Sequence, residues 1–321
     1  MSPSLRLPSW LAPTQPEVAI EIAHRRLTVA QLGRGTPPTV AGYATESLPD
    51  DAVVPSLTSR NIANPKVVSE ALKRALDRAG IKSPSRVALV VPDTVARVSL
   101  LPFEQMPGRQ SELEQLIRWN VKKSVPFSVD DAVLSYVPAT VDGGVTTLAA
   151  VVSRRDVIAE YESVADAIGA HAGIVDLASF NVINTALACG VAPKGDWLLV
   201  CLADDSTTIV IMRGSALMFH RHKAADSEPL SALVHQTAMY HEDRLGGTQF
   251  ACVFLSGGGA GIEGGGHERA RKEIADRLQA EVQTLDVRRA AALTNRVSAS
   301  PELLDALAAP VGALLRERGV A

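Results

Sequence analysis

The distribution of apolar residues predicts a strand hairpin and then a long helix near the start of the chain. Apolar residues alternate over VAIEI (residues 18–22), and this period of two is typical of a strand. A short His24-Arg25 turn leads to a second apolar run over residues 26–32, which we expect to pair with the first. Further on, Asn64-Pro65 provides a helix cap and a first helical residue for an apolar stripe that ends at Gly80.

Between residues 86 and 169 the pattern becomes a compact run of strand, strand, helix, strand, strand and helix. The first of these helices is predicted to open at the capping box SELE (residues 111–114) and to stop before Pro126. An Asp142-Gly143-Gly144 turn joins the second pair of strands, and Ser153 is the predicted cap of the last helix. We interpret this segment as a small α+β module, after which a helix over residues 179–188 returns to the first domain.

The second half of the chain begins again with strands. Three apolar runs, over residues 198–202, 207–212 and 215–220, are separated by short polar turns. A helix over 229–245 and a strand over 250–255 follow, and then come a glycine turn, a helix over 267–278, a strand over 282–285 and a final helix from Ser300. The predicted organisation is a terminal arm (1–15), a first lobe (16–85 and 170–195), the module (86–169) and a second lobe (196–321).

Composition narrows the classes of partner. The net charge is −3, from 32 basic and 35 acidic residues, which gives no electrostatic reason to expect nucleic acid. The three cysteines form no Cys-x-x-Cys pair, so neither a disulfide framework nor a zinc site is predicted, and a reducing cytoplasm fits. No apolar stretch approaches the ~20 residues of a membrane span, and the first residues carry no signal-peptide pattern.

The most informative local pattern is the apolar run VFLS, which ends in the glycine turn Ser256-Gly257-Gly258-Gly259. Without Cβ atoms the backbone can approach a ligand closely. In a strand–turn–helix arrangement it can also direct N–H groups at a phosphate or a nucleotide base. The turn lacks the Gly-Lys-Ser/Thr ending of a phosphate loop. A plain connection between strand and helix is therefore the alternative interpretation.

No catalytic constellation accompanies this turn. His220 and His222 would project from one face of a strand, either as a weak metal pair or as part of a solvated strand face. The chain contains no His-x-x-x-His helix pair with a glutamate and no Gly-x-Ser-x-Gly motif. We therefore predict neither catalytic residues nor a metal site.

Several motifs in order resemble the type IV pilus assembly protein PilM family. The more specific ones are ELEQLIRWNVKKSVPFSVDDAVLSY (residues 112–136) and the LSGGGAG turn (residues 255–261). The hairpin VAIEIAHRRLTVAQL, the strand pair VALVVPDTVARVSLLPF, the segment GIVDLASFNVINTAL and the closing VGALLRERG are diffuse but correctly ordered. The resemblance covers the chain from Pro16. It implies an α/β actin-like (ribonuclease H-like) fold, similar to FtsA, with two lobes around a nucleotide cleft and a small inserted α+β module.

The resemblance also implies ATP and Mg²⁺ as candidate ligands, held by two hairpin turns and the glycine turn. Nucleotide-binding roles would fall on Glu21, Arg25, Ser206, Thr207, Ser256, Gly257, Gly258 and Gly259. This sequence departs from the family pattern, because Glu21 and Cys201 stand where Asp is expected and a neutral thiol is a poor magnesium ligand. Glu21 and Arg25 are either a magnesium partner and a phosphate clamp or a solvated hairpin pair. We expect weakened or lost ATP hydrolysis, while nucleotide binding is left open.

By the same resemblance, the partner is the short cytoplasmic N-terminal tail of a PilN-like single-span membrane protein, lying between the first lobe and the module. The candidate contact residues are Arg118, Trp119, Lys122, Val125 and Phe127. Trp and Arg carry binding energy most often, whereas the apolar residues of this set could instead form the module's own core. The implied role is a cytoplasmic scaffold that is peripheral at the inner membrane through this partner and acts with other pilus assembly components.

Three other functions compete with this one. The first is an ATP-dependent switch of the same fold, in which the nucleotide closes the lobes and changes partner affinity. The second is the cytoplasmic platform component of a type II secretion system. The third is an actin-fold sugar kinase, which would need a catalytic Asp in the first lobe and intact phosphate hairpins.

Overall fold

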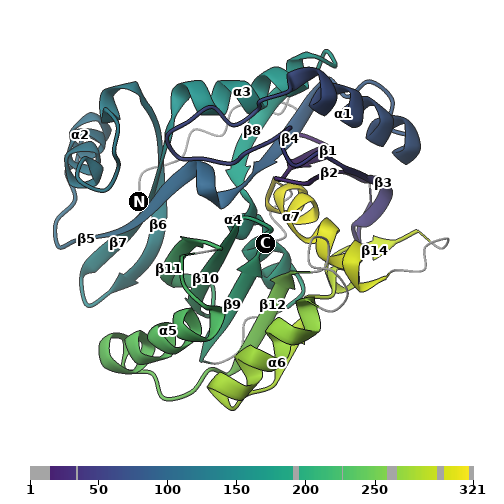
Figure 1. Ribbon diagram of the computed structural model, residues 1–321. Helices are drawn as coiled ribbons and strands as arrows, with labels where there is room; N and C mark the ends of the chain where they lie inside the picture. The colour runs from purple at the N-terminus through teal and green to yellow at the C-terminus, as the bar shows by residue number, and fades with distance from the viewer. Residues whose placement is uncertain are drawn as a thin grey trace.

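The computed structural model describes residues 15–33, 35–190, 195–225, 227–258, 266–294 and 300–317. Two α/β lobes and a smaller sheet make up this part of the chain, as Figure 1 shows. The predicted terminal arm lies outside the described residues apart from Gln15. Within the described ranges, no helix has the length and apolar character that a membrane crossing requires.

The first lobe is built on a six-stranded sheet with the order β14-β3-β2-β1-β4-β8. Its strands are β1 (Val18–Ile22), β2 (Arg26–Leu32), β3 (Thr39–Ser47), β4 (Arg86–Val91), β8 (His171–Leu177) and β14 (Ala292–Leu293). The predicted hairpin of β1 and β2 is present, and β1 also pairs in parallel with β4. The carboxyl ends of β1 and β4 therefore lie at one edge of the sheet, where open α/β sheets usually bind their ligands.

Helix α1 (Pro65–Ala79) covers one face of this sheet and begins and ends as its sequence predicts. The Asn64 side chain accepts a hydrogen bond from the Val67 N–H, and Gly80 closes the helix in the left-handed region with φ 68°. The buried stripe of α1 packs with helix α3 (Arg155–Asp166) in one apolar core, which contains Val68, Leu72, Tyr161 and Val164.

The inserted module is a three-stranded antiparallel sheet in the order β5-β7-β6, formed by β5 (Ala96–Phe103), β7 (Val145–Arg154) and β6 (Ala132–Asp142). By sheet pairing it spans residues 96–154, which is narrower than the predicted 86–169, because β4 belongs to the first-lobe sheet and α3 packs in the first-lobe core. Helix α2 (Gln110–Val121) covers one face of the module sheet. This helix begins at Gln110, so Ser111 lies inside the first turn and the predicted capping box does not form.

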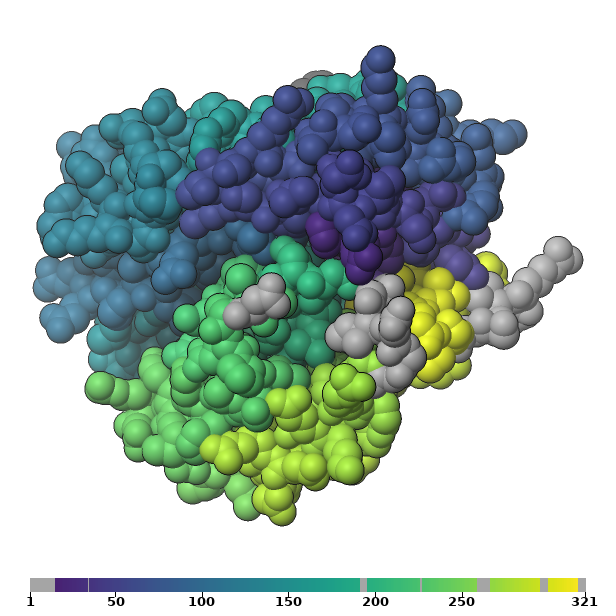
Figure 2. All heavy atoms as spheres, viewed as in Figure 1, coloured from purple at the N-terminus to yellow at the C-terminus, as the bar shows by residue number. Residues whose placement is uncertain are grey.

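The second lobe is a five-stranded sheet in the order β11-β10-β9-β12-β13. Its strands are β9 (Asp196–Leu202), β10 (Ser206–Arg213), β11 (Ala216–Ala224), β12 (Cys252–Gly257) and β13 (Val282–Thr284). Helices α5 (Leu230–Leu245) and α6 (Gly266–Leu278) bury one face of the sheet, with Leu233, Val234 and Ile274 in that core. Figure 2 shows the blue module and the green second lobe meeting along a seam.

Two helices form the layer between the lobes. Helix α4 (Ala178–Ala188) packs against helix α7 (Pro301–Glu317), and the two helices share one apolar core with both sheets. Gly312 lies directly on the Asn181 carbonyl, and the Thr185 hydroxyl donates to the Ala308 carbonyl at 2.6 Å. Because β14 and α7 join the first-lobe sheet and this central layer, the C-terminal segment differs from the predicted assignment of all residues 196–321 to the second lobe.

Asp196 links β9 to α5 at the far end of the second lobe. Its carboxylate accepts hydrogen bonds from Arg213 (Nε, 2.7 Å) and from His241 (Nε2, 2.8 Å), and both Asp196 and His241 are buried. The Arg213 guanidinium, followed by His241, lowers the pKa of Asp196 below its usual value despite burial. A carboxyl with a lowered pKa in the folded state stabilises the fold above its unfolded pKa, and this stability is lost as the pH falls through the folded pKa.

We therefore expect Asp196→Ala to lower the free energy of unfolding by about 2 kcal/mol at pH 7, because the buried His241 ring loses its acceptor. Arg213 is partly exposed, so the loss of its ion pair with Asp196 adds little to the fall in the free energy of unfolding. Urea denaturation of the wild type and the variant at pH 7 and below pH 4 would measure this difference, which should shrink at the lower pH. An equal difference at both pH values would contradict an ionised Asp196.

Candidate functional site

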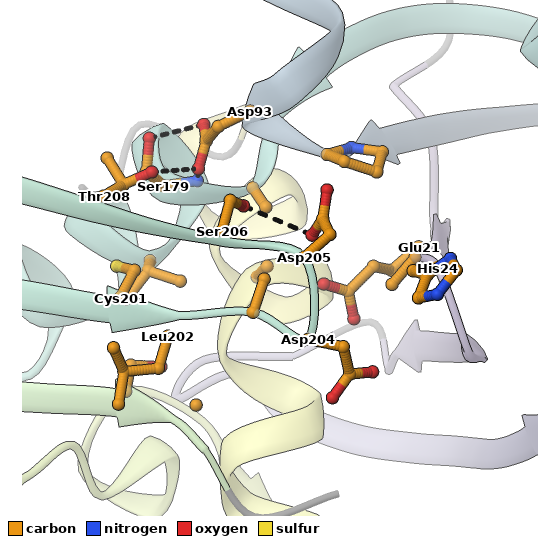
Figure 3. A pocket seen from close by; sticks show the side chains of 18 of the residues that line it. Glu21, His24, Asp93, Ser179, Cys201, Leu202, Asp204, Asp205, Ser206 and Thr208 are labelled. Carbon is orange, nitrogen blue, oxygen red and sulfur yellow. Dashed lines mark hydrogen bonds between the residues drawn. The ribbon is translucent and has the colours of Figure 1, made fainter. Parts of the chain in front are cut away.

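A pocket of about 90 Å³ lies between the two lobes, where the turns of both hairpins meet the glycine turn and helix α7. Glu21 enters from the β1–β2 hairpin, Asp204 and Asp205 enter from the β9–β10 turn, and Asp93 follows β4 (Figure 3). Asp305 of α7 also lines the pocket. These five carboxylates face a single arginine among the described lining residues, Arg26.

The structure brings five of the eight predicted nucleotide-binding residues to this pocket, namely Glu21, Ser206, Ser256, Gly257 and Gly258. Arg25 instead forms an ion pair with Asp50 on the surface (Nε to Oδ1, 2.8 Å). Thr207 is buried beside the pocket but does not line it. Gly259 lies outside the described residues.

Glu21 is held between an attractive and two repulsive charges. Its carboxylate lies 3.4 Å from Nη2 of Arg26, the residue after the one predicted to bind phosphate. Burial raises the pKa of Glu21, and Asp305 and Asp93 raise it further, while Arg26 opposes them. Arg26, the first residue of β2, is therefore the cation beside Glu21, whereas Arg25 lies in the turn before β2 and pairs with Asp50.

Cys201 occupies the position in β9 that corresponds to Glu21 in β1. Burial raises the pKa of the Cys201 thiol well above its usual value, and Asp93 and Asp305 add to the shift. The thiol is neutral at physiological pH and lacks the charge with which a carboxylate would hold Mg²⁺.

The glycine turn is already bound to groups of the chain itself. The Gly257 N–H and the Ser256 hydroxyl both donate to Oδ1 of Asp305, the latter at 3.0 Å, and the Gly258 N–H donates to the Leu202 carbonyl at 3.2 Å. Gly257 has φ 92°, and a Cβ there would lie 1.8 Å from the Leu202 oxygen, so only glycine fits this strand end. The Asp305 carboxylate thus sits where the turn would otherwise receive an anion.

A polar network crosses from the first lobe to the second beside this pocket. Asp93 accepts hydrogen bonds from the Ser179 hydroxyl (2.7 Å) and the Thr208 hydroxyl (3.0 Å), as Figure 3 shows. Behind them, His220 Nε2 lies 3.3 Å from Ser179 Oγ, and His222 Nδ1 lies 2.9 Å from Thr208 Oγ1. Groups from the turn after β4 and from α4, β10 and β11 are therefore joined across the interface between the lobes.

The two histidines are neutral in this network. Burial lowers the pKa of His220 to about 4 and also lowers the pKa of His222, although Asp93 opposes both shifts. The prediction of a solvated strand face for this pair is wrong, because both rings pack against first-lobe residues. Within the described part of the chain, no cluster of three His, Cys, Asp or Glu side chains could hold a metal ion.

Another groove, of about 390 Å³, lies between the module and helix α4 of the central layer, with β8 of the first lobe and the start of β11 of the second lobe beside it. We call it the tail groove. One wall is strand β6, an edge strand of the module sheet, with Tyr136, Val137 and Pro138. The other walls are helix α4 and the start of β11, which contribute Phe180, Ile183, Leu187 and Leu217. Asp176 and Arg316 form an ion pair at its rim.

Comparison with known families identifies the chain. The profile of the family "Type IV pilus assembly protein PilM" matches residues 20–243. The chain belongs to the PilM family. No curated protein sequence matches it significantly.

Solved structures agree with a PilM-family fold. A chain of the PilM–PilN type IV pilus biogenesis complex superposes with a TM-score of 0.80 at 16% identity, over 95% of this chain and 99% of that one. A Bacteroides thetaiotaomicron protein with an actin-like ATPase fold has a TM-score of 0.50 at 10% identity, over 91% and 94% of the two chains. The cytoplasmic domain of EpsL, from the type II secretion system of Vibrio cholerae, has a TM-score of 0.50 at 11% identity, over 95% and 94%. The predicted actin-like fold is confirmed.

The partner-binding residues predicted from the PilM resemblance lie away from the tail groove. All five are on or just after α2, which covers the opposite face of the module sheet from the lobes. Val125 and Phe127 pack in the module's own core, as the alternative interpretation held. Arg118 pairs with Glu114 and donates to the Val129 carbonyl, while Trp119 is 71% exposed.

The pocket of this PilM-family chain, as the structure describes it, does not fit Mg-ATP. Its volume is well below the roughly 300–1,000 Å³ of small-molecule sites. The first N–H of the glycine turn is bound to Asp305, and the five carboxylates would repel phosphate oxygens. A nucleotide could enter only if the lobes opened and Asp305 left the turn.

Proposed function

We propose that this chain is a cytoplasmic scaffold of type IV pilus assembly that binds the N-terminal tail of a PilN-like membrane protein in the tail groove. The observation that carries the proposal is an apolar groove between the module and helix α4 of a PilM-family chain. The superposition on a chain of the PilM–PilN complex supports it. Such a tail would hold the scaffold at the inner membrane, where other assembly components could meet it.

The walls of the tail groove suit an extended apolar peptide. β6 is paired with β7 on one side only, so N–H and C=O groups on its other side can pair with a peptide strand. Phe180, Ile183 and Leu187 line α4 at one-turn intervals and provide pockets for alternate side chains. Val137 is 58% exposed and lines the groove, so its apolar side chain is accessible to a peptide that lies there.

Titration of a fluorescent N-terminal peptide of the cognate PilN-like protein, followed by anisotropy, tests this assignment. We expect Val137→Asp to weaken binding about 30-fold, which corresponds to the roughly 2 kcal/mol of a central apolar anchor. Val141→Asp is the matched control, because Val141 lies on the same strand and is more exposed but does not line the groove.

Trp119→Ala separates the two candidate surfaces. If the tail lies in the groove, this variant should bind as tightly as the wild type. Loss of binding by Trp119→Ala together with full binding by Val137→Asp would instead place the partner on the outer surface of α2.

Binding of ATP with Mg²⁺ is a second candidate function. It is favoured by the convergence of Glu21, Ser206, Ser256, Gly257 and Gly258 on one pocket between two actin-like lobes. Hydrolysis is not part of this proposal, because Cys201 is neutral and Glu21 has a raised pKa. Binding would need an open state in which Asp305 no longer occupies the glycine turn.

A further inference from the structure

A second groove, of about 550 Å³, lies between the module and the second lobe. It shares no lining residue with the tail groove. We call it the basic groove, because Arg97, Arg221 and Lys223 line it and none of its described lining residues is acidic. This groove is lined by cations, whereas the pocket between the two lobes is lined by five carboxylates that face one arginine.

No described residue neutralises the three cations of the basic groove. None of them forms an ion pair with a described residue. Arg221 is nevertheless held in place, since its guanidinium lies 5.4 Å above the Phe219 ring and Nη1 donates to Gln236 Oε1 at 2.7 Å. A neutral hydrogen-bond acceptor and a ring face fix the side chain without cancelling its charge, which leaves its other N–H groups for an anion.

The backbone around the groove is arranged to receive an extended chain. β11 is an edge strand of the second-lobe sheet, and β5 is an edge strand of the module sheet. The two strands lie close to each other across the groove (Figure 1). Arg221 and Lys223 project from β11 and Arg97 projects from β5, so the cations flank the space beside the free edge of β11. An extended segment in the groove would find the backbone of an edge strand and charged side chains there.

Other charged groups near the groove do not reverse this balance. Glu228 accepts a hydrogen bond from Gln236, and it does not line the groove. Asp205 and Asp93 are behind the wall, bonded to Thr94 and Thr208. The ring nitrogens of His220 and His222 face the hydroxyl groups of that wall.

We propose that the basic groove binds an acidic, extended segment of a protein partner, which adds to the edge of β11 and places its carboxylates against Arg97, Arg221 and Lys223. The edge strands favour a peptide over a lipid headgroup or a nucleic acid, because neither of those needs strand backbone. The proposal is independent of the tail groove and of nucleotide binding.

The test uses the full chain and a fluorescein-labelled peptide of four Glu-Val repeats, which can form a strand with carboxylates on one face. Anisotropy titration should show saturable binding that weakens as salt is added. The same peptide with Gln in place of Glu should bind at least about tenfold more weakly, because the charge-assisted hydrogen bonds are lost. Equal binding of both peptides would overturn the proposal.

Variants localise the binding. The double variant Arg97→Ala with Lys223→Ala should bind the Glu-Val peptide at least about tenfold more weakly than the wild type does. Lys66→Ala with Lys73→Ala is the matched control, because it removes two exposed cations from α1 and should change nothing. Both variants remove exposed side chains, and equal melting temperatures would confirm that they fold. An equal loss of affinity in the two variants would mean nonspecific attraction and would overturn the site.

Charge reversal and competition complete the test. The double variant Arg97→Glu with Lys223→Glu should no longer bind the Glu-Val peptide. It should instead bind a Lys-Val peptide. Phosphatidylglycerol vesicles and inorganic polyphosphate, at matched negative charge, should compete weakly with the Glu-Val peptide. If either of them binds the wild type more tightly than the peptide does, the groove recognises lipid or phosphate, and the assignment to a protein partner is wrong.

Discussion

Replacing Gly312 with alanine is expected to lower the free energy of unfolding by about 3 kcal/mol or more, as overpacking at a rigid contact does. Helices α4 and α7 touch backbone to backbone at this point. A Cβ on Gly312 would lie 1.8 Å from the Asn181 carbonyl oxygen and 2.7 Å from Thr185 Oγ1. An alanine gains about 1 kcal/mol of helix propensity over glycine. That gain is smaller than the cost of separating two helices that share the core with both sheets.

Urea denaturation followed by circular dichroism measures the effect of Gly312→Ala. Gly108→Ala is the matched control, because a Cβ at Gly108 meets no atom within 4 Å, and we expect a change of less than about 0.5 kcal/mol. If Gly312→Ala proved as stable as this control, the close approach of α4 and α7 would not exist in solution.

Replacing Asp305 with asparagine is expected to raise the affinity for Mg-ATP by at least about tenfold, under the second candidate function. The wild-type carboxylate holds the Gly257 N–H and the Ser256 hydroxyl, so an incoming anion must displace it. It also repels that anion, and two unit charges 4 Å apart interact by about 4 kcal/mol at an effective dielectric constant of 20. An amide removes the charge and is a weaker acceptor.

Calorimetric titration of Mg-ATP into the wild type and Asp305→Asn would measure this gain. Asp204→Asn is the informative control, because Asp204 lines the same pocket and no hydrogen bond joins it to the described residues of the glycine turn. The control removes the same charge, so a larger gain in Asp305→Asn isolates the occupation of the turn. Equal affinities for the two variants would contradict a specific role of Asp305, and no binding by either would leave a scaffold without nucleotide.

The elements that local sequence determines were predictable. Helix α1 was predicted from its cap at Asn64 and its end at Gly80. The first hairpin was predicted from the alternation of residues 18–22. The end of a strand at Ser256-Gly257 was also visible, because a positive φ needs glycine. The actin-like fold followed from several such motifs in order, and not from any one of them.

The contacts that decide the chemistry were not predictable from spacing. Asp305 meets Gly257 from 48 residues away, and Asp93 meets Thr208 from 115 residues away. No local pattern distinguishes these carboxylates from other polar residues. The histidine pair failed for the same reason, since alternation in β11 gives the shared face of His220 and His222 but not what covers that face. The role of the α2 residues stays a prediction, because an exposed Trp indicates a partner without indicating which one.

The position of α7 has a consequence for protein synthesis. Strands β1 and β2 leave the ribosome about 270 residues before α7, and their inner face shares its core with that helix. At about 5–20 residues per second, this apolar face stays uncovered for roughly 15–60 s in each nascent chain, a period in which chaperones would have to protect it. Arg316 of α7 lies at the rim of the tail groove, paired with Asp176. A partner tail that binds in this groove as proposed would meet the complete groove only after α7 has been made and has docked, so binding would report on the docking of α7.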